Sequence, residues 1–131
     1  LYPGIAKLLR DLHGQGVRSI VATSKPTIYA KQIIDHHGLT TSFDLIVGSN
    51  LDHTRVAKTE VIAHVLAERP GLTDGSLVMV GDREHDVIGA RNNGLDAIGV
   101  SYGYGSADEL HASGAIAVAR SVAELRQLLG A

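Results

Sequence analysis

The sequence predicts an α/β domain in which a mostly parallel sheet carries helices on both faces. Strand-like apolar runs alternate with helix-like periodic segments to the end of the chain, and 15 glycines fall largely between those segments. A length of 131 residues, of which 44% are hydrophobic, is enough for one core and one domain. We therefore expect residues 1–131 to form a single core domain with no linker.

The first half of the chain alternates helix, strand, helix and strand. An apolar stripe predicts a helix over Leu1–His13, which two glycines end. The run Val17–Thr23 is typical of a buried strand, and Pro26 stands where a helix can begin. That helix is expected to end at Gly38, and the run Phe43–Val47 predicts the second strand.

The middle of the chain continues the same alternation. Periodicity predicts a helix over Lys58–Arg69 and another over Glu84–Asn93, with the apolar strand Leu77–Val80 between them. The inward faces of the two helices are expected to be formed by Val61, Ile62, Val65 and Leu66 in the first, and by Val87, Ile88 and Ala90 in the second.

The last part of the chain adds two strands and two helices. The fourth strand begins over Ala97–Val100, and Ala115–Ala119 predicts a weak fifth strand. Each is followed by a serine with a glutamate three residues later, which is capping-box spacing before a helix: Ser106 with Glu109, and Ser121 with Glu124.

Residues with phosphate and metal chemistry are expected at one rim of this sheet, because ligands of open parallel sheets bind at the carboxyl ends of the strands. The first strand ends in Thr23-Ser24-Lys25, the third runs into Gly81–Asp86, and Lys58 opens a helix after the second. Hydroxyls and backbone amides at such turns bind phosphate oxygens, and a lysine neutralises phosphoryl charge. Two carboxylates one helical turn apart, Asp82 and Asp86, suit Mg²⁺.

Each of these residues also has a purely structural interpretation. Asp82 could cap a helix, Asp86 could pair with a helix dipole, Thr23 could be a turn hydroxyl, and Lys58 could be a surface lysine. Their joint arrival at predicted strand ends is what favours a site over these separate explanations.

Composition excludes several other classes of function. With a net charge of -2 and 4% aromatic residues, the chain has no basic field for a nucleic-acid backbone and few rings to stack on bases. The absence of cysteine excludes disulfides, thiolate zinc sites and cysteine nucleophiles. No apolar run approaches membrane-spanning length and no signal-peptide layout opens the chain, so we expect no membrane partner and a cytoplasmic location.

The order of these residues resembles motifs of the haloacid dehalogenase (HAD) superfamily, and most closely its phosphoglycolate phosphatase-like and 5′-nucleotidase-like members. The resemblance rests on the strand ending in Thr23, then Lys58, then the sequence GDREHD over Gly81–Asp86, and it covers essentially the whole chain. It implies a Rossmann-like core and a Mg²⁺-dependent phosphatase that acts on a small phosphomonoester.

The resemblance also implies a role for each matching residue. Thr23 would hold a phosphate oxygen with help from the Ser24 amide, and Lys25 would be a third substrate-binding residue beside them. Lys58 would stabilise the nucleophile and the phosphoryl charge. Asp82 would bind Mg²⁺ directly, and Asp86 would complete the acidic site directly or through water.

The sequence departs from the family where the nucleophile should be. The nucleophile motif of the form DxDGT and the helical cap that selects the substrate would precede Leu1, so we expect this chain alone to be inactive. In the family, the missing first strand lies between the strand ending at Thr23 and the strand ending at Asp82. We expect an empty middle in the sheet, whose two edges would either be exposed, which would favour self-association, or have to pair directly with each other. The stretch Asn50–Thr54 resembles the motif after a strand, but Asn50 stands in place of the nucleophile and His53 in place of glycine, so we interpret it as a decoy.

Two hypotheses from different classes follow. The first is the HAD phosphohydrolase, whole or truncated, and the second is a non-catalytic phosphate-binding module or pseudoenzyme that acts through a partner. Because the cap that selects the substrate is absent, phosphoglycolate, a nucleoside monophosphate and another small phosphomonoester are all candidate substrates.

Overall fold

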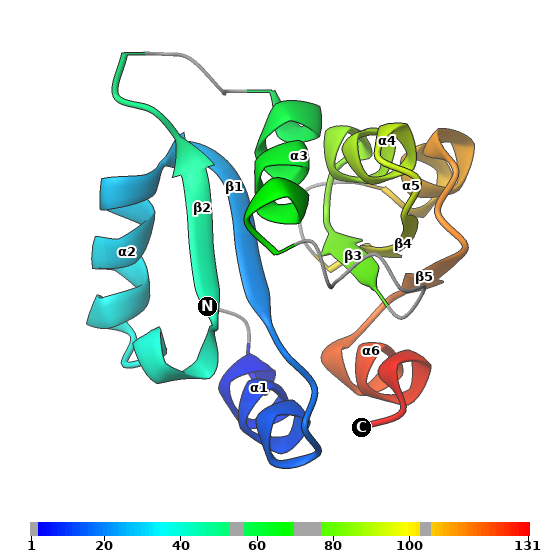
Figure 1. Cartoon of the computed structure of the whole chain (residues 1–131). Coiled ribbons are helices and arrows are strands. Elements are labelled where there is room, and N and C mark those ends of the chain that lie inside the picture. Colours follow the sequence, from blue (N-terminus) through cyan, green and yellow to red (C-terminus); the bar gives the residue numbers. More distant parts are fainter. Residues whose placement is uncertain (1–2, 53–56, 70–76, 103–105) are drawn as a thin grey trace.

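A computed structural model describes residues 3–52, 57–69, 77–102 and 106–131 of the chain (Figure 1). The elements alternate in the predicted order: α1 (Ile5–Gly14), β1 (Ile20–Pro26), α2 (Thr27–His36), the 3₁₀ turn η1 (Thr40–Ser42), β2 (Leu45–Ser49), α3 (Lys58–Glu68), β3 (Val78–Gly81), α4 (Glu84–Asn92), β4 (Asp96–Val100), α5 (Ala107–Ser113), β5 (Ala117–Ala119) and α6 (Val122–Leu129). Among the described residues, no helix has both the length and the apolar character needed to cross a bilayer.

The strands form two parallel sheets instead of one. In the first, β1 pairs with β2, and in the second the order is β3-β4-β5. Figure 1 shows the two sheets on opposite sides of the molecule, with α3 above the space between them. The α/β class and the parallel pairing are confirmed, and the division falls between β1 and β3, where the sequence predicted an empty middle.

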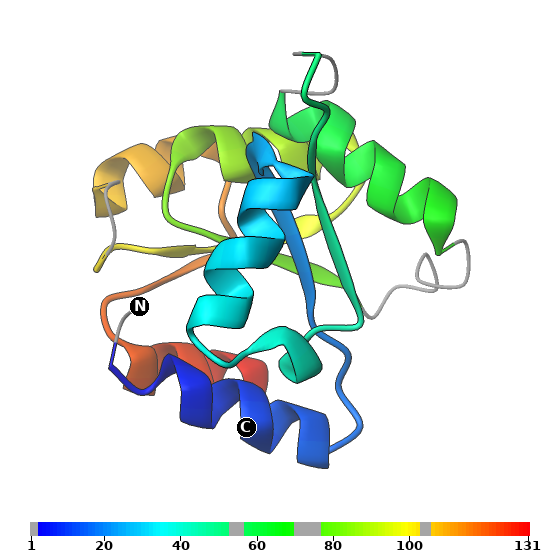
Figure 2. The same ribbon diagram turned by 90° about the vertical axis from the view of Figure 1, so that its left-hand side faces the viewer.

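Helices cover both faces of the larger sheet, as predicted. Along β4, Ala97 packs into a cluster with α3, α4 and α5, whereas its neighbour Ile98 packs into a cluster with α1 and α6. This alternation follows from the two-residue period of a strand, and Figure 2 shows the two groups of helices above and below the strands. The sheet is therefore buried on both sides, which is the usual state of parallel strands.

Several strand boundaries differ from the prediction. Strand β1 begins at Ile20 because Val17 belongs to the turn that ends α1: its N–H donates to the Leu12 carbonyl, and the residue is 44% exposed. The strand continues to Pro26. The shift carries Thr23 from the end of the strand into it, while the register of β1 against β2 becomes irregular after Ala22.

The other strand boundaries shift for related reasons. Strand β2 begins at Leu45 and not at Phe43, because η1 precedes it and places Phe43 in the connection. Only the last part of the run Ala115–Ala119 pairs, so β5 is three residues long. In both cases the apolar run extends beyond the residues that find a partner strand.

The inward faces of the helices are predicted correctly with one exception. The buried residues of α3 include Val61, Ile62 and Val65, while Val87 and Ala90 of α4 are fully buried. The inward placement predicted for Ile88 is wrong, because this residue is 43% exposed. It follows the buried Val87 by one residue, which turns its side chain about 100° around the helix and away from the sheet.

Candidate functional site

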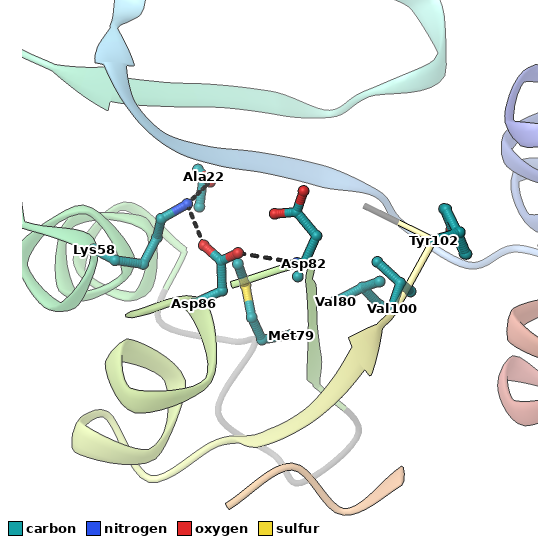
Figure 3. A pocket seen from close by; sticks show the side chains of 9 residues that line it. Ala22, Lys58, Met79, Val80, Asp82, Asp86, Val100 and Tyr102 are labelled. Carbon is teal, nitrogen blue, oxygen red and sulfur yellow. Dashed lines mark hydrogen bonds and ion pairs between the residues drawn. The ribbon is translucent and has the colours of Figure 1, made fainter. Parts of the chain in front are cut away.

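The candidate site is an open cavity of about 240 Å³ between the two sheets. Strand β1 contributes Ala22 on one side, and strands β3 and β4 contribute the other, so the cavity lies where the sheet is divided. Helices α3 and α4 close one end of it with charged side chains (Figure 3). Its lining consists of Ala22, Lys58, Met79, Val80, Gly81, Asp82, Asp86, Val100 and Tyr102.

Lys58 is the first residue of α3, and its side chain reaches across to both neighbouring elements. The Nζ atom donates to the Ala22 carbonyl oxygen of β1 at 3.0 Å and lies 2.7 Å from the Asp86 Oδ1 atom of α4. Its side chain is 10% exposed and that of Asp86 is 7% exposed. Because little water reaches this ion pair, the attraction between its two charges is only weakly screened. The pair therefore holds the ammonium at the cavity wall.

Asp86 lies in the first turn of α4 and organises the loop before that helix. Its Oδ2 atom accepts hydrogen bonds from the backbone N–H groups of Asp82 at 3.1 Å and Arg83 at 3.2 Å. Gly81 permits this arrangement, because a Cβ atom at that position would collide with the Asp86 side chain. Both oxygens of Asp86 are thus engaged, one by Lys58 and the other by the loop.

Asp82 provides the second carboxylate of the cavity. It follows β3 directly, and its backbone is held by Asp86. Figure 3 shows its carboxylate directed toward β1, on the same side of the loop as the Lys58–Asp86 pair. With one ammonium and two carboxylates at the wall, the three side chains carry a net negative charge, which favours a cation in the cavity.

The chemistry of this donor set fits Mg²⁺. Among the residues that the structure describes, no group of three or more histidine, cysteine, aspartate or glutamate side chains is placed to hold a metal ion. Mg²⁺ does not need one, because it is commonly bound through one or two carboxylates, with water and substrate oxygens completing its octahedron. Asp82 would hold the ion directly, and Asp86, whose oxygens contact Lys58 and the loop, would complete the acidic site through water.

The phosphate-binding residues predicted from sequence lie just beyond this cavity. Thr23, Ser24 and Lys25 follow Ala22 along β1, but none of the three belongs to the lining. The Thr23 Oγ1 atom accepts a hydrogen bond from the Lys25 N–H at 3.2 Å, which is a local turn of the kind that threonine often makes. Thr23 and Ser24 are half-buried, whereas Lys25 is exposed.

The motif-like stretch after β2 lies at a different cavity. Asn50 and Leu51 line a hollow of about 400 Å³ together with Thr27, Ile28, Lys31 and Ser49, and it shares no lining residue with the cavity of Asp82. His53 and Thr54, which belong to the same stretch, lie outside the described residues.

Sequence reasoning missed several residues of the site. The Ala22 carbonyl receives Lys58, and Met79, Val80, Val100 and Tyr102 line the apolar part of the cavity. A backbone acceptor, ordinary strand residues and the tyrosine that follows β4 carry no motif, so only their position in the fold gives them a role. Gly89 of α4 is a further case, because a Cβ atom there would lie 3.0 Å from the Lys58 Cγ atom.

Comparison with known proteins gives one family match and several similar relatives. Residues 1–100 match the family described as haloacid dehalogenase-like hydrolase. The chain is 44% identical over 129 residues to a 5′-nucleotidase of Pseudomonas aeruginosa, covering 98% of this chain and 58% of the relative. It is 44% identical over 132 residues to the tyrosine-protein kinase PtkA of Mycobacterium tuberculosis, covering 99% of this chain and 45% of that relative.

A phosphoglycolate phosphatase and a solved structure agree with this. The phosphoglycolate phosphatase of Vibrio parahaemolyticus is 29% identical over 129 residues, covering 98% of this chain and 56% of the relative. The crystal structure of a predicted phosphatase from Clostridium acetobutylicum superimposes with a TM-score of 0.90 at 45% identity, covering 99% of this chain and 60% of that one. The expected resemblance is confirmed, and the chain spans about half the length of the curated relatives it matches.

Proposed function

Because this chain belongs to the haloacid dehalogenase-like hydrolase family, we propose that it forms most of the core of a Mg²⁺-dependent phosphatase. The substrate would be a small phosphomonoester, either phosphoglycolate-like or nucleotide-like. The observation that carries the proposal is the shielded contact between Lys58 and Asp86, with Asp82 beside it at the divided sheet. Such a wall offers a fixed positive charge to a phosphoryl group and a carboxylate to a cation.

Each residue has a specific part in this proposal. Lys58 would neutralise charge on the phosphoryl oxygens, and Asp86 would hold the ammonium in place. Thr23 and the Ser24 N–H would bind a further phosphate oxygen from the β1 side, and Lys25 would add positive charge nearby. Asp82 would hold Mg²⁺, which when bound supplies charge neutralisation at the phosphate.

The reaction we propose needs a nucleophile from outside these 131 residues. A carboxylate oxygen would attack phosphorus while the bond to the substrate oxygen breaks, and the leaving oxygen would take a proton from a general acid. Water would then attack the aspartyl-phosphate, releasing inorganic phosphate and restoring the carboxylate. In the family this carboxylate stands at the end of a strand, as the sequence resemblance implies.

The divided sheet supports that source of the nucleophile. Strands β1 and β3 present edges that are not hydrogen-bonded to each other, and the cavity lies between them. Unpaired parallel edges are unfavourable, because parallel strands are normally paired and covered. A further parallel strand between β1 and β3 would join the two sheets, and its carboxyl end would reach the cavity beside Lys58.

Hydrolysis of p-nitrophenyl phosphate with Mg²⁺ tests this proposal. The 131-residue chain should show no turnover, and a longer protein that also contains the nucleophile-bearing strand should be active. Turnover by the 131-residue chain that Asp52→Asn abolishes would contradict the decoy interpretation. Phosphate binding without turnover in the longer protein would favour the alternative, a non-catalytic phosphate-binding module that acts through a partner.

Three further expectations belong to this proposal. We propose that the chain has no nucleic-acid partner, in keeping with a net charge of -2. We also propose a cytoplasmic location. We also propose that the 131-residue chain can self-associate through the edges of β1 and β3. Sedimentation over a range of protein concentrations measures this, and a monomer at every concentration would contradict it.

A further inference from the structure

Glu109 connects helix α5 to the loop that carries Asp82. Its Oε1 atom accepts a hydrogen bond from the Glu84 N–H at 3.1 Å and lies 3.6 Å from the Arg83 Nε atom. The Glu109 side chain is 26% exposed, so solvent reaches this bridge only in part. Glu84 is the first residue of α4, and Arg83 is the residue that precedes it.

This contact differs from what the sequence motif predicts. In a capping box, the glutamate bonds back to the start of its own helix. The first half of the box is present in α5, because the Ser106 Oγ atom accepts from the Glu109 N–H at 3.1 Å. The Glu109 carboxylate, however, turns to α4, whereas Glu124 of α6 bonds back to the chain just before its own helix, accepting from the Arg120 N–H at 3.2 Å.

The result is a loop held by carboxylates on two sides. The N–H groups of Asp82 and Arg83 donate to Asp86, and the next one, of Glu84, donates to Glu109. Three successive amides at the start of α4 are therefore occupied by carboxylate oxygens from two different helices. The N–H groups of these three residues are therefore not free to bind a phosphate oxygen.

We propose that Glu109 is a positioning residue that fixes the loop of Asp82 for metal binding. The inference rests on the proposed function, because it takes Asp82 as the residue that holds Mg²⁺. Asp86 anchors the loop at one side, and Glu109 anchors it at the other through Glu84 and Arg83. Groups that orient a metal ligand commonly change metal affinity by about 10- to 100-fold when they are removed.

Three variants of the 131-residue chain separate this role from general helix stability. Glu109→Ala removes the acceptor, Glu109→Gln keeps an oxygen for the Glu84 N–H, and Glu124→Ala removes the equivalent carboxylate of α6, far from the loop. Two quantities are measured: the Mg²⁺ dissociation constant by calorimetry and the exchange rate of the Glu84 amide by NMR.

Glu109→Ala should raise the dissociation constant at least about tenfold and speed exchange of the Glu84 amide about as much. Glu109→Gln keeps the acceptor for the Glu84 N–H and loses only a long, exposed contact with Arg83, which contributes little. This variant and Glu124→Ala, at a distant helix, should therefore leave both quantities within about a factor of two. Rescue by glutamine would not be expected if the Glu109 charge alone attracted the metal.

An unchanged Mg²⁺ affinity in Glu109→Ala, together with its loss in Asp82→Asn, would overturn the role of Glu109 and leave the metal site intact. Absence of Mg²⁺ binding in the unaltered chain would instead contradict the metal assignment of the proposed function. In that case, exchange of the Glu84 amide still tests whether Glu109 holds the loop. Faster exchange in Glu109→Ala alone would support this role, and equal exchange in all three variants would overturn it.

Discussion

The ammonium of Lys58 and the carboxylate of Asp86 are both largely shielded from water, and each depends on the other. Removing one partner of such a pair leaves a charge with too little compensation. If Lys58 were replaced, Asp86 would keep its two backbone hydrogen bonds and would gain access to water from the cavity. The loss of stability should therefore be smaller than for a fully enclosed charge.

We therefore expect Lys58→Met to lower the free energy of unfolding by about 2–3 kcal/mol. Urea denaturation measures this. Lys7→Met is the matched control, because Lys7 pairs with Asp11 on the surface with its side chain 68% exposed, and it should change stability little. Equal effects of the two substitutions would show that the Lys58–Asp86 pair contributes no more than a surface pair.

Gly89 sets how closely α3 approaches α4 at the site. A Cβ atom there would lie 3.0 Å from both the Lys58 Cγ atom and the Thr59 backbone nitrogen. Helix propensity alone would favour Gly89→Ala by about 1 kcal/mol, but overpacking costs about 1–3 kcal/mol. We expect a net loss of about 1 kcal/mol in thermal or urea unfolding.

Gly14→Ala is the control for this substitution, because no described atom outside the adjoining backbone of α1 lies within 4 Å of a Cβ atom placed there. It should leave stability unchanged or slightly raised. A Gly89→Ala variant that is also stabilised would show that the approach of the two helices relaxes without strain.

At the residue scale, sequence reasoning could place functional groups but not their contacts. The ends of strands are visible in a sequence, so Thr23, Asp82 and the start of the helix at Lys58 could be brought to one rim in advance. That Asp86 would pair with Lys58, and that Glu109 would leave its own helix, depends on how helices pack. The burial of Lys58 and Asp86 likewise appears only when α3, α4 and β1 meet.

At the scale of elements, α1 and α6 are joined by Asp11. Its carboxylate accepts from Lys7 at 2.9 Å within α1 and from Arg126 of α6 at 2.7 Å. The hydrogen bond from Lys7, and then that from Arg126, hold the pKa of Asp11 below its ordinary value of 3.8. A lowered pKa means that the folded state favours the charged carboxylate.

The pH dependence follows from that direction. The stabilisation by Asp11 is fully present above the pKa of the unfolded chain and is lost as the pH falls through the lower pKa of the folded chain. We expect Asp11→Asn to be less stable than the unaltered chain near neutral pH, with the difference shrinking below about pH 4. Urea unfolding of both proteins near neutral pH and below about pH 4 measures this difference in stability. A difference that does not change with pH would contradict the lowered pKa of Asp11.

The order and type of the elements could be predicted because helix periodicity and strand-like apolar runs are local patterns. Strand limits could not, since a residue such as Val17 or Phe43 is apolar enough for a strand but finds no partner there. The inward placement predicted for Ile88 was wrong for a related reason. When two apolar residues are adjacent in a helix, apolar character alone does not tell which of them faces the sheet.

In the whole molecule, the division between β1 and β3 is both the main irregularity of the fold and the place of the candidate site. The two sheets are separate where the cavity lies, and the charged side chains that fit a phosphate and Mg²⁺ stand at the end of that division. The sequence resemblance predicted the open middle from the order of strands in the family. This chain covers 58% of the 5′-nucleotidase and 60% of the Clostridium acetobutylicum structure. The unmatched part of these relatives is long enough to contain a further strand.

A calorimetric titration of the 131-residue chain with Mg²⁺ in the presence of inorganic phosphate tests whether the two ligands meet between β1 and β3. Asp96→Asn is the control, because Asp96 is exposed at the opposite, amino-terminal end of β4. We predict that Asp82→Asn raises the Mg²⁺ dissociation constant at least about tenfold, while Asp96→Asn leaves it unchanged. Equal Mg²⁺ affinity in the unaltered chain and the Asp82→Asn variant would contradict the claim that Mg²⁺ and phosphate meet between β1 and β3.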